Sequence, residues 1–344
     1  MRAVVVSEPE PDGDTAATTP ADRLELVERE RPTPGIEEVL IDVAACGICG
    51  GDTAAVADGA ATTYPRVPGH EVVGRVVATG ERVTAVESGD RVAVGWHAGH
   101  CGRCDPCRRG DHTNCPEQRV TAIHRDGGYA EYTTAHRDAL ARVPDGLAAT
   151  DAAALVCAGT TAFNALRHGP ARPGDTVAVQ GIGGVGHLAV QTAAHAGFET
   201  VALSRGTDKR EAAFEFGADH YVDTTDDDPA SRLRELGGAD VLLGTAPSRS
   251  AIAAVVDGLA PNGQLLLVAP PDGPVPVDVG RLVAGRASVR GWSSGTPVDA
   301  EDTFALGVEG ALDPVVEQFP LADAAAAYRR TAENRTRFRA VLEP

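Results

Sequence analysis

Short runs of β-branched and other apolar residues dominate the first 150 positions of the chain. VLIDVAA at 39–45, VVGRVVATG at 72–80 and DRVAVGW at 90–96 are each bounded by Gly, Pro or Asp at close intervals. Runs of this length with such boundaries are typical of β-strands joined by turns and loops. The first 150 residues therefore predict an all-β fold with long loops that are available for function.

From Asp175 onward the pattern changes to strands that alternate with helices. DTVAVQ precedes a helical pattern over residues 184–196, and TVALS precedes a second helical pattern over residues 208–216. Strand patterns recur at HYVD, DVLLGTA, GQLLLVA and SVRGW. Six strands with intervening helical segments predict a doubly wound parallel sheet.

The stretch from about Gly295 predicts helices over residues 300–309 and 323–334 and a closing strand, RFRAVLEP. It is too short for a third domain, so we expect it to fold back onto the first one. The length of 344 residues suits two domains, each with a core of its own.

The chain is strongly acidic, with 49 Asp and Glu against 31 Lys and Arg and a formal net charge of −18. This charge repels phosphate backbones and anionic lipids, which argues against nucleic-acid and membrane partners. Lys209 is the only lysine, and an acidic shell of this kind suits high salt, where self-repulsion is screened. We expect a halophilic protein; an arginine-biased genome is the alternative.

No apolar run approaches the roughly 20 residues that span a bilayer. The start of the chain, MRAVVVSEPEPDGD, lacks the long apolar stretch and cleavage site of a secretory signal. We therefore expect a soluble, cytoplasmic protein.

The segment GIGGVG at 181–186 matches G-x-G-x-x-G between a predicted strand and a predicted helix. Small residues allow the backbone to approach a pyrophosphate at the helix N-terminus, so the pattern indicates a dinucleotide site. The candidate contacts in this segment are Gly181, Gly183, Gly184, Val185 and Gly186.

The second strand of this region ends at Ser204, where an enzyme selective for NAD would place an acidic residue. Arg205 follows, and Lys209 is close behind. A carboxylate would repel a 2′-phosphate, whereas Ser204 can donate a hydrogen bond and Arg205 a charged fork. These residues favour NADP over NAD; the alternative is that Arg205 is simply solvated.

Four of the seven cysteines form the pattern C-x2-C-x2-C-x7-C: Cys101, Cys104, Cys107 and Cys115. Four thiolates on one compact loop satisfy tetrahedral zinc without an open position, which describes a structural site. A ferredoxin-like iron–sulfur cluster is the alternative for the metal.

Three scattered residues could build a second, open metal site: Cys49, His70 within PGHE, and Cys157 within LVCAGTTAFNAL. Each residue alone is weak evidence. Together they offer three protein ligands, the number that leaves zinc a fourth position for a substrate.

CGIC-x-x-D, PGHE-x-x-G, the four-cysteine segment, DGGYAEY, CAGTTAFNAL and GIGGVG together resemble the zinc-dependent medium-chain alcohol dehydrogenases over nearly the whole chain. The resemblance is closest to the microbial NADP-linked branch, which acts on primary alcohols and aldehydes. It implies an α/β-plus-β fold: a GroES-like catalytic domain, residues 1–157 and 296–344, interrupted by a Rossmann domain, residues 158–295. It also implies a homodimer or homotetramer.

The resemblance implies roles for individual residues around the catalytic zinc. By motif position Cys49, His70 and Cys157 would be the ligands, and Glu71 would approach the metal when substrate is absent. Asp52 would accept the ring N–H of His70 and fix its tautomer.

Three further residues match positions that contact cofactor or substrate in this family. Thr161 corresponds to a nicotinamide contact and Arg339 to a pyrophosphate contact. Trp96 corresponds to an aromatic residue that narrows the substrate pocket, although an ordinary core tryptophan is the alternative. Cys46 is expected to be a packed thiol rather than a ligand.

The chain departs from the family pattern in the segment CGICGGDTA. Gly51 stands where the family has Ser or Thr, Ala54 stands where a His is frequent, and Gly50 replaces a basic or histidine residue. The usual groups that carry the alcohol proton are therefore missing. We expect a water beside Gly51 to carry it, so that Gly51→Ser raises the rate at neutral pH; His97 is the alternative carrier.

The expected reaction is reversible hydride transfer between NADP(H) and a small to medium primary alcohol or its aldehyde, with two zinc ions per subunit and NAD(H) less favoured. A polyol or sugar dehydrogenase is one alternative, and Cys157 argues against it because a carboxylate is frequent there in polyol enzymes. A zinc protein that binds NADPH with little turnover is the other.

Overall fold

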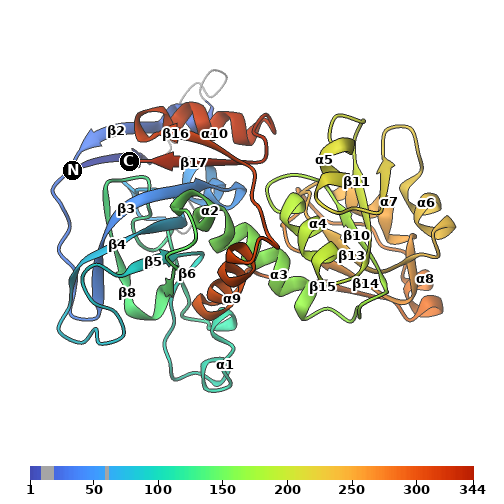
Figure 1. Cartoon of the computed structure of the whole chain (residues 1–344), viewed down its shortest axis with the longest axis horizontal. Helices are drawn as coiled ribbons and strands as arrows, with labels where there is room; N and C mark the ends of the chain where they lie inside the picture. Colours follow the sequence, from blue (N-terminus) through green and yellow to red (C-terminus); the bar gives the residue numbers. More distant parts are fainter. Residues whose placement is uncertain (9–18, 59–61) are drawn as a thin grey trace. The chain divides into compact units, whose positions relative to one another are not determined.

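The computed structural model describes residues 1–8, 19–58 and 62–344 and divides into two compact units (Figure 1). Unit 1 comprises Met1–Cys157, Gly295–Glu309 and Pro314–Pro344, and unit 2 comprises Ala158–Ser294 and Gly310–Asp313. Residues 9–14, part of the amino-terminal segment considered above, lie outside the described residues. Within the described residues, no helix combines the length and apolar character needed to cross a bilayer.

Unit 1 is built on a seven-stranded sheet in the order β16-β17-β3-β4-β5-β9, with β8 also paired to β3. The strands are β3 Glu38–Ile48, β4 Glu71–Thr79, β5 Arg91–Val94, β8 Tyr132–His136, β9 Leu140–Arg142, β16 Val316–Pro320 and β17 Arg339–Glu343. Two smaller sheets pair β1 Arg2–Val6 with β2 Leu24–Glu28, and β6 His97–Gly99 with β7 Arg119–Val120. The predicted β-rich first domain and the return of the last strand to it are confirmed.

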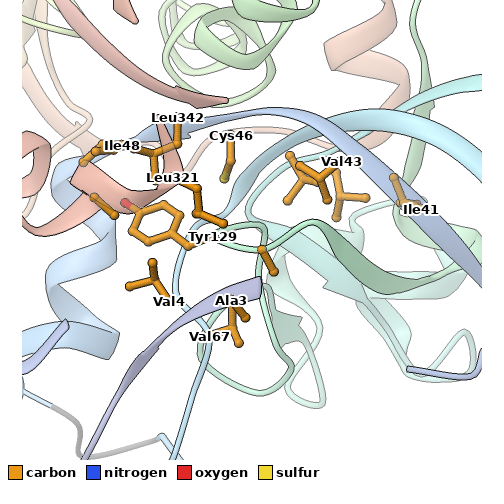
Figure 2. Close-up of a cluster of buried hydrophobic side chains, with 14 of the residues drawn as sticks. Ala3, Val4, Ile41, Val43, Cys46, Ile48, Val67, Tyr129, Leu321 and Leu342 are labelled. Atoms are coloured by element: carbon orange, nitrogen blue, oxygen red, sulfur yellow. The ribbon is translucent and has the colours of Figure 1, made fainter. Parts of the chain in front are cut away.

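The core of unit 1 gathers apolar side chains from segments that are far apart in the sequence. Figure 2 shows residues of β1, β3 and β17 meeting around the ring of Tyr129, which is fully buried. The labelled members are Ala3, Val4, Ile41, Val43, Cys46, Ile48, Val67, Tyr129, Leu321 and Leu342. Burial of apolar area of this kind is the main favourable contribution to folding.

Helical segments of unit 1 lie at its loops and beside its sheet. They include α1 Asp105–Arg108, α2 Ala149–Ala154, α9 Pro297–Val308 and α10 Ala324–Ala332, together with the short turns η2 Gly50–Asp52 and η4 His112–Asn114. Directly after α2 comes η6 Leu155–Gly159, a turn of π-helix, and α3 Thr160–Arg167 follows it in unit 2.

Unit 2 holds a six-stranded sheet whose strands are all parallel, in the order β12-β11-β10-β13-β14-β15. The strands are β10 Thr176–Gln180, β11 Glu199–Ser204, β12 His220–Asp223, β13 Ala239–Gly244, β14 Leu259–Leu267 and β15 Ser288–Gly291. The helices that alternate with them are α4 Gly186–His195, α5 Arg210–Glu215, α6 Pro229–Glu235, α7 Arg249–Val256 and α8 Val279–Gly285. Every residue of the central strand β10 is buried, as a strand covered on both faces requires. The predicted doubly wound parallel sheet is confirmed.

The short segment Gly310–Asp313 belongs to unit 2 although its neighbours on both sides belong to unit 1. The amide of Gln191 on α4 accounts for this placement. Its Nε2 donates to the Asp313 carbonyl at 3.0 Å, and its Oε1 accepts from the Asp313 N–H at 2.6 Å.

Candidate active site and metal centres

Four side chains from three segments of unit 1 converge on one buried point. Cys49 follows β3, His70 and Glu71 stand at the start of β4, and Cys157 lies on η6. One ligand atom from each lies within 4.8 Å of the others, and all but Cys49 are buried. Both thiols are free. The structure therefore brings together the three residues predicted from scattered motifs, with Glu71 beside them.

The local backbone explains why these residues meet. β3 and β4 pair antiparallel with Gly47 opposite Glu71, so the end of one strand lies beside the start of the other. A Cβ on Gly47 would lie 2.0 Å from Glu71 Oε2, so only glycine leaves room for this side chain. Gly69, with φ +94°, makes the turn that leads into His70.

Asp52 fixes the orientation of the His70 ring. Its Oδ1 lies 2.7 Å from His70 Nδ1, and its Oδ2 accepts the backbone N–H of Cys49 at 3.0 Å. Both Asp52 and His70 are 1% exposed. A proton held on Nδ1 leaves the lone pair of Nε2 directed at the cysteines, which is the tautomer that a metal ligand needs.

The two cysteines differ in protonation when no metal neutralises them. A hydrogen bond from the Cys157 thiol holds the pKa of Cys49 well below its ordinary value, and the same contact raises the pKa of Cys157. The lowered pKa of Cys49 favours its thiolate form, which is the form that binds metal.

Glu71 forms a buried ion pair with Arg339 of β17, and these residues are 0% and 4% exposed. Burial raises the pKa of Glu71 to about 8, against the opposing effect of the arginine. Its second oxygen, Oε1, has no hydrogen-bond partner among the described residues. An unpaired buried carboxyl oxygen beside a cysteine sulfur and an imidazole, from which a cation would displace any proton, is a chemical fit for a cation.

Distances in the cluster also fit zinc. Cys157 Sγ lies 3.4 Å from His70 Nε2. Tetrahedral zinc with bonds of about 2.3 Å to sulfur and about 2.0 Å to nitrogen separates these two atoms by about 3.5 Å. The donor set and this spacing therefore fit zinc.

The four-cysteine segment forms a second cluster, around α1 and η4. Cys101, Cys104, Cys107 and Cys115 place their sulfur atoms within 4.8 Å of one another, and all four thiols are free. Cys115 Sγ lies 3.6 Å from Cys101 Sγ and 3.8 Å from Cys104 Sγ. A tetrahedron of sulfur around zinc has edges of about 3.8 Å, so this set fits a closed site.

The surroundings of Gly51 bear on the expected effect of Gly51→Ser. A Cβ on Gly51 would lie 2.9 Å from His70 Cε1 and 3.0 Å from Trp96 Cζ3. The Trp96 ring meets the His70 ring edge-on, with centroids 4.9 Å apart. A serine side chain therefore does not fit here unless one of these rings moves, which argues against the expected gain in rate of Gly51→Ser. The water as proton carrier stays a prediction.

His97, the alternative proton carrier, lies in a network of polar side chains. Its Nε2 lies 3.1 Å from His100 Nδ1, and its Nδ1 lies 3.2 Å from Gln118 Nε2. Both ring nitrogens are therefore engaged by polar neighbours. Burial, with the nearby charges of His100 and His112, lowers the pKa of His97 to about 4.

In unit 2, the predicted glycine loop lies between β10 and α4. Gly181 has φ +93°, and a Cβ on Gly186 would lie 1.8 Å from the Gly181 carbonyl oxygen. Both positions therefore require glycine. Lys209 donates from Nζ to the Ile182 carbonyl at 2.7 Å, which ties the loop to the segment after β11.

The residues considered for the 2′-phosphate lie at the end of β11. Ser204 is the last residue of that strand, and Arg205 is exposed. The Gly206 N–H donates to Asp223 Oδ1 at 2.7 Å, which fixes the turn. Thr161 lies on α3 and is 6% exposed.

Two residues near the open site were missed by the sequence reasoning. Gly47 provides the space for Glu71, and Tyr129 donates its hydroxyl hydrogen to Asp52 Oδ2 at 2.9 Å. The motif DGGYAEY was the only signal for Tyr129. Nothing in the neighbouring sequence singles out Gly47, because its partner lies on another strand.

Comparisons with known proteins agree with this geometry. Residues 35–145 match the alcohol dehydrogenase GroES-like domain, and residues 184–308 match the zinc-binding dehydrogenase family. Alcohol dehydrogenase patD of Penicillium expansum is 40% identical over 338 residues, which cover 95% of this chain and 99% of that protein. An alcohol dehydrogenase of Geobacillus stearothermophilus is 36% identical over 324 residues, which cover 93% of this chain and 96% of that protein.

The fold is also similar to that of a solved alcohol dehydrogenase structure. The cobalt- and zinc-bound thermostable alcohol dehydrogenase from Pyrobaculum aerophilum has a TM-score of 0.87 at 29% identity, over 100% of this chain and 99% of that one.

The GroES-like sheet, the Rossmann sheet and the Cys/His cluster define a zinc-type medium-chain dehydrogenase. Within that class, the chain belongs to the alcohol dehydrogenases and interconverts alcohols with aldehydes. The family implies zinc and a nicotinamide cofactor.

Proposed function

We propose that this enzyme prefers NADP(H) and interconverts small to medium primary alcohols and aldehydes at an open zinc site formed by Cys49, His70 and Cys157. The observation that carries the proposal is the buried cluster of these side chains, in which the distance between Cys157 Sγ and His70 Nε2 fits tetrahedral zinc. Cys101, Cys104, Cys107 and Cys115 hold a second, structural zinc in this proposal.

When bound, zinc would supply Lewis-acid chemistry for the substrate oxygen, and a nicotinamide cofactor would supply the hydride chemistry. The side chains of the protein orient the metal ligands and balance the charge around them. Asp52 keeps the proton of His70 on Nδ1, so that Nε2 remains a donor to the metal. Arg339 pairs with Glu71 and neutralises its charge, while Glu71 Oε1 remains unpaired at the site.

Trp96 adjoins the ring of His70, which supports its proposed role as a wall that limits substrate size. Thr161 and Arg339 are proposed as contacts to the nicotinamide and the pyrophosphate, on the family resemblance. The glycine requirement at Gly181 and Gly186 supports a pyrophosphate at the start of α4.

Preference for NADP rests on the end of β11. Ser204 and the exposed Arg205 stand where an NAD enzyme carries a carboxylate, and an exposed guanidinium is free to form a charged fork with a 2′-phosphate. Lys209 already donates to the Ile182 carbonyl, so its proposed contribution is a charge beside the loop. Aldehyde reduction is the proposed physiological direction, because an NADPH pool favours it.

We also propose a cytoplasmic, salt-adapted enzyme that works as a homodimer or homotetramer, on its acidic composition and its family. A zinc protein that binds NADPH with little turnover is the second candidate. The observation in its favour is Gly51, which supplies no hydroxyl to carry the alcohol proton and is crowded by His70 and Trp96.

Steady-state oxidation of NADPH and NADH with a panel of aldehydes, beside elemental analysis, tests these proposals. We expect two zinc ions per chain, turnover with small to medium aldehydes, and a higher kcat/KM with NADPH. Equal kcat/KM with both cofactors would refute the NADP preference, and two zinc ions without turnover would support the second candidate.

The paired substitution Ser204→Asp with Arg205→Ile should reverse the cofactor preference. Hydrogen bonds to a charged group contribute about 1.5 to 3 kcal/mol, which corresponds to about one to two decades in kcat/KM. Arg210→Ile, at another exposed arginine close by in the chain, is the matched control and should leave the preference for NADPH in place.

A further inference from the structure

We infer that Tyr129 is a positioning residue for the open metal site: it holds the Asp52 carboxylate that orients His70. The inference rests on the proposed function, because it assigns a role at the same site. It concerns a hydroxyl group that the reaction itself does not need.

The Asp52 carboxylate receives donors on both oxygens. Tyr129 donates to Oδ2 at 2.9 Å, and the backbone N–H of Cys49 donates to the same oxygen at 3.0 Å. These two bonds fix the plane of the carboxylate and leave Oδ1 directed at His70 Nδ1, 2.7 Å away. Without the tyrosine, one backbone N–H alone would hold the far side of the carboxylate.

Tyr129 also packs against the turn that leads into His70. A Cβ on Gly69 would lie 2.3 Å from Tyr129 Cδ1, so the ring touches the Gly69 backbone directly. The Tyr129 N–H donates to the Pro68 carbonyl at 3.0 Å, and the Gly128 N–H donates to the Gly69 carbonyl at 2.9 Å. One residue therefore contacts both the backbone before His70 and the partner of its ring.

The ring and the hydroxyl of Tyr129 have different roles: the ring packs in the buried core, and the hydroxyl adds one hydrogen bond. Tyr129 is 0% exposed and lies in the apolar cluster with Val4, Ile48 and Leu321 (Figure 2). A phenylalanine would fill this space with the same ring and without the cost of burying a hydroxyl. The bond to Asp52 is the contact that the hydroxyl adds, and burial keeps the group protonated because it raises the pKa of Tyr129 well above its ordinary value.

The expected consequence concerns how long the metal stays bound. Residues that hold the partner of a ligating histidine typically change metal affinity or activity by about 10- to 100-fold. Tyr129 is one bond further from the metal, so we expect an effect near the lower end, about tenfold.

The test is the release of zinc from the two-zinc holoenzyme to a chromophoric chelator. In Tyr129→Phe, one zinc should leave about tenfold faster than in the parent enzyme, while the other leaves at the parent rate. Tyr132→Phe is the matched control, because Tyr132 is a half-buried tyrosine three residues away whose ring stacks on Arg31, 4.0 Å from its guanidinium. It should leave both rates unchanged.

A second experiment, with the Asp52→Asn variant, tests whether Tyr129 acts on zinc release through Asp52. If Tyr129 acts through Asp52, Tyr129→Phe should add nothing to the faster release already caused by Asp52→Asn. Additive effects in the double variant would overturn the inference. So would parent-like release in Tyr129→Phe, or an equal acceleration of both zinc ions with loss of the fold. A parent enzyme that holds no zinc would overturn the proposed function itself, and this inference with it.

Discussion

Gly50 and Gly51 are neighbours in the same short turn, η2, and have opposite surroundings. No described atom lies within 4 Å of a Cβ built on Gly50, whereas a Cβ on Gly51 lies 2.9 Å from the His70 ring. Asp52 prevents that ring from moving aside, since it holds Nδ1 at 2.7 Å. A side chain at position 51 must therefore displace His70 or Trp96.

Gly51→Ser should lower activity by at least about tenfold and weaken zinc retention, because it misaligns a metal ligand. Metal content after dialysis and kcat with an aldehyde measure this. Gly50→Ser is the matched control, with the same chemical change one residue earlier, and should keep both zinc ions. A Gly51→Ser enzyme with full metal content and raised activity at neutral pH would contradict this prediction.

His97 gives the enzyme a predictable response to acid. Its pKa is about 4 in the folded chain against an ordinary 6.5, chiefly because it is buried. Between these two values the unfolded chain binds a proton that the folded chain does not bind. Folding stability should therefore fall as the pH is lowered through this window, by up to about 3 kcal/mol from this residue.

His97→Gln should flatten that dependence. The free energy of unfolding of the variant should change less than that of the parent between pH 6.5 and pH 4. Denaturant unfolding at a series of pH values measures it, and His195→Gln, at an exposed position on α4, is the control. If the free energy of unfolding depended on pH in the same way in the parent and in His97→Gln, His97 would not be the cause of the pH dependence.

At the scale of elements, sequence patterns predicted the features that depend on residues close together in the chain. The expected helices over 184–196, 208–216, 300–309 and 323–334 are α4, α5, α9 and α10; α4, α5 and α10 are shorter than predicted, and α9 begins three residues earlier, at Pro297. Apolar and β-branched runs predicted all six strands of the parallel sheet and β3, β4, β5 and β17 of the seven-stranded sheet, but not β8, β9 or β16. The spacing of the four cysteines predicted their cluster, because all four lie in one short stretch.

Features that depend on contacts between distant segments were not predicted. The π-helical turn that carries Cys157 interrupts a continuous helical pattern, and nothing in that pattern marks it. The crowding of Gly51 comes from His70 and from Trp96, in the bend between β5 and β6, so the local sequence showed only that a hydroxyl was missing. The Gln191 contact that assigns Asp313 to unit 2 joins residues 122 positions apart.

The two cysteine-containing elements should respond differently to a chelator. The four-cysteine loop offers a closed set of sulfur ligands, whereas the proposed zinc site at Cys49 keeps its fourth position open to exchange. Mild chelation should therefore abolish activity with loss of one zinc before far-ultraviolet circular dichroism or the melting temperature changes appreciably. If removal of one zinc per chain caused loss of structure together with loss of activity, the assignment of the Cys49 site as the exchangeable one would be contradicted.

At the scale of the whole molecule, the net charge of −18 sets how stability depends on salt. At about 1 M salt the screening length falls to about 3 Å, which removes most repulsion between exposed carboxylates. The melting temperature should therefore rise by several degrees from low salt to about 1 M NaCl.

Neutralising part of the acidic surface should reduce that response. Asp226→Asn with Asp227→Asn removes two charges from an exposed turn and should make the melting temperature less dependent on salt. Sucrose, which favours the compact state without screening charge, separates this effect from general preferential exclusion. A melting temperature that falls with added NaCl would show that surface ion pairs dominate instead.

The pairing of β17 with β3 has a consequence for synthesis on the ribosome. The proposed structural zinc site lies within one short stretch and can fill as soon as that stretch emerges. The open site must wait for Cys157, and Glu71 has no buried cation until Arg339, 268 positions later, leaves the exit tunnel. The two zinc ions should therefore be acquired in a fixed order, the closed site during translation and the open site completed only with the last strand.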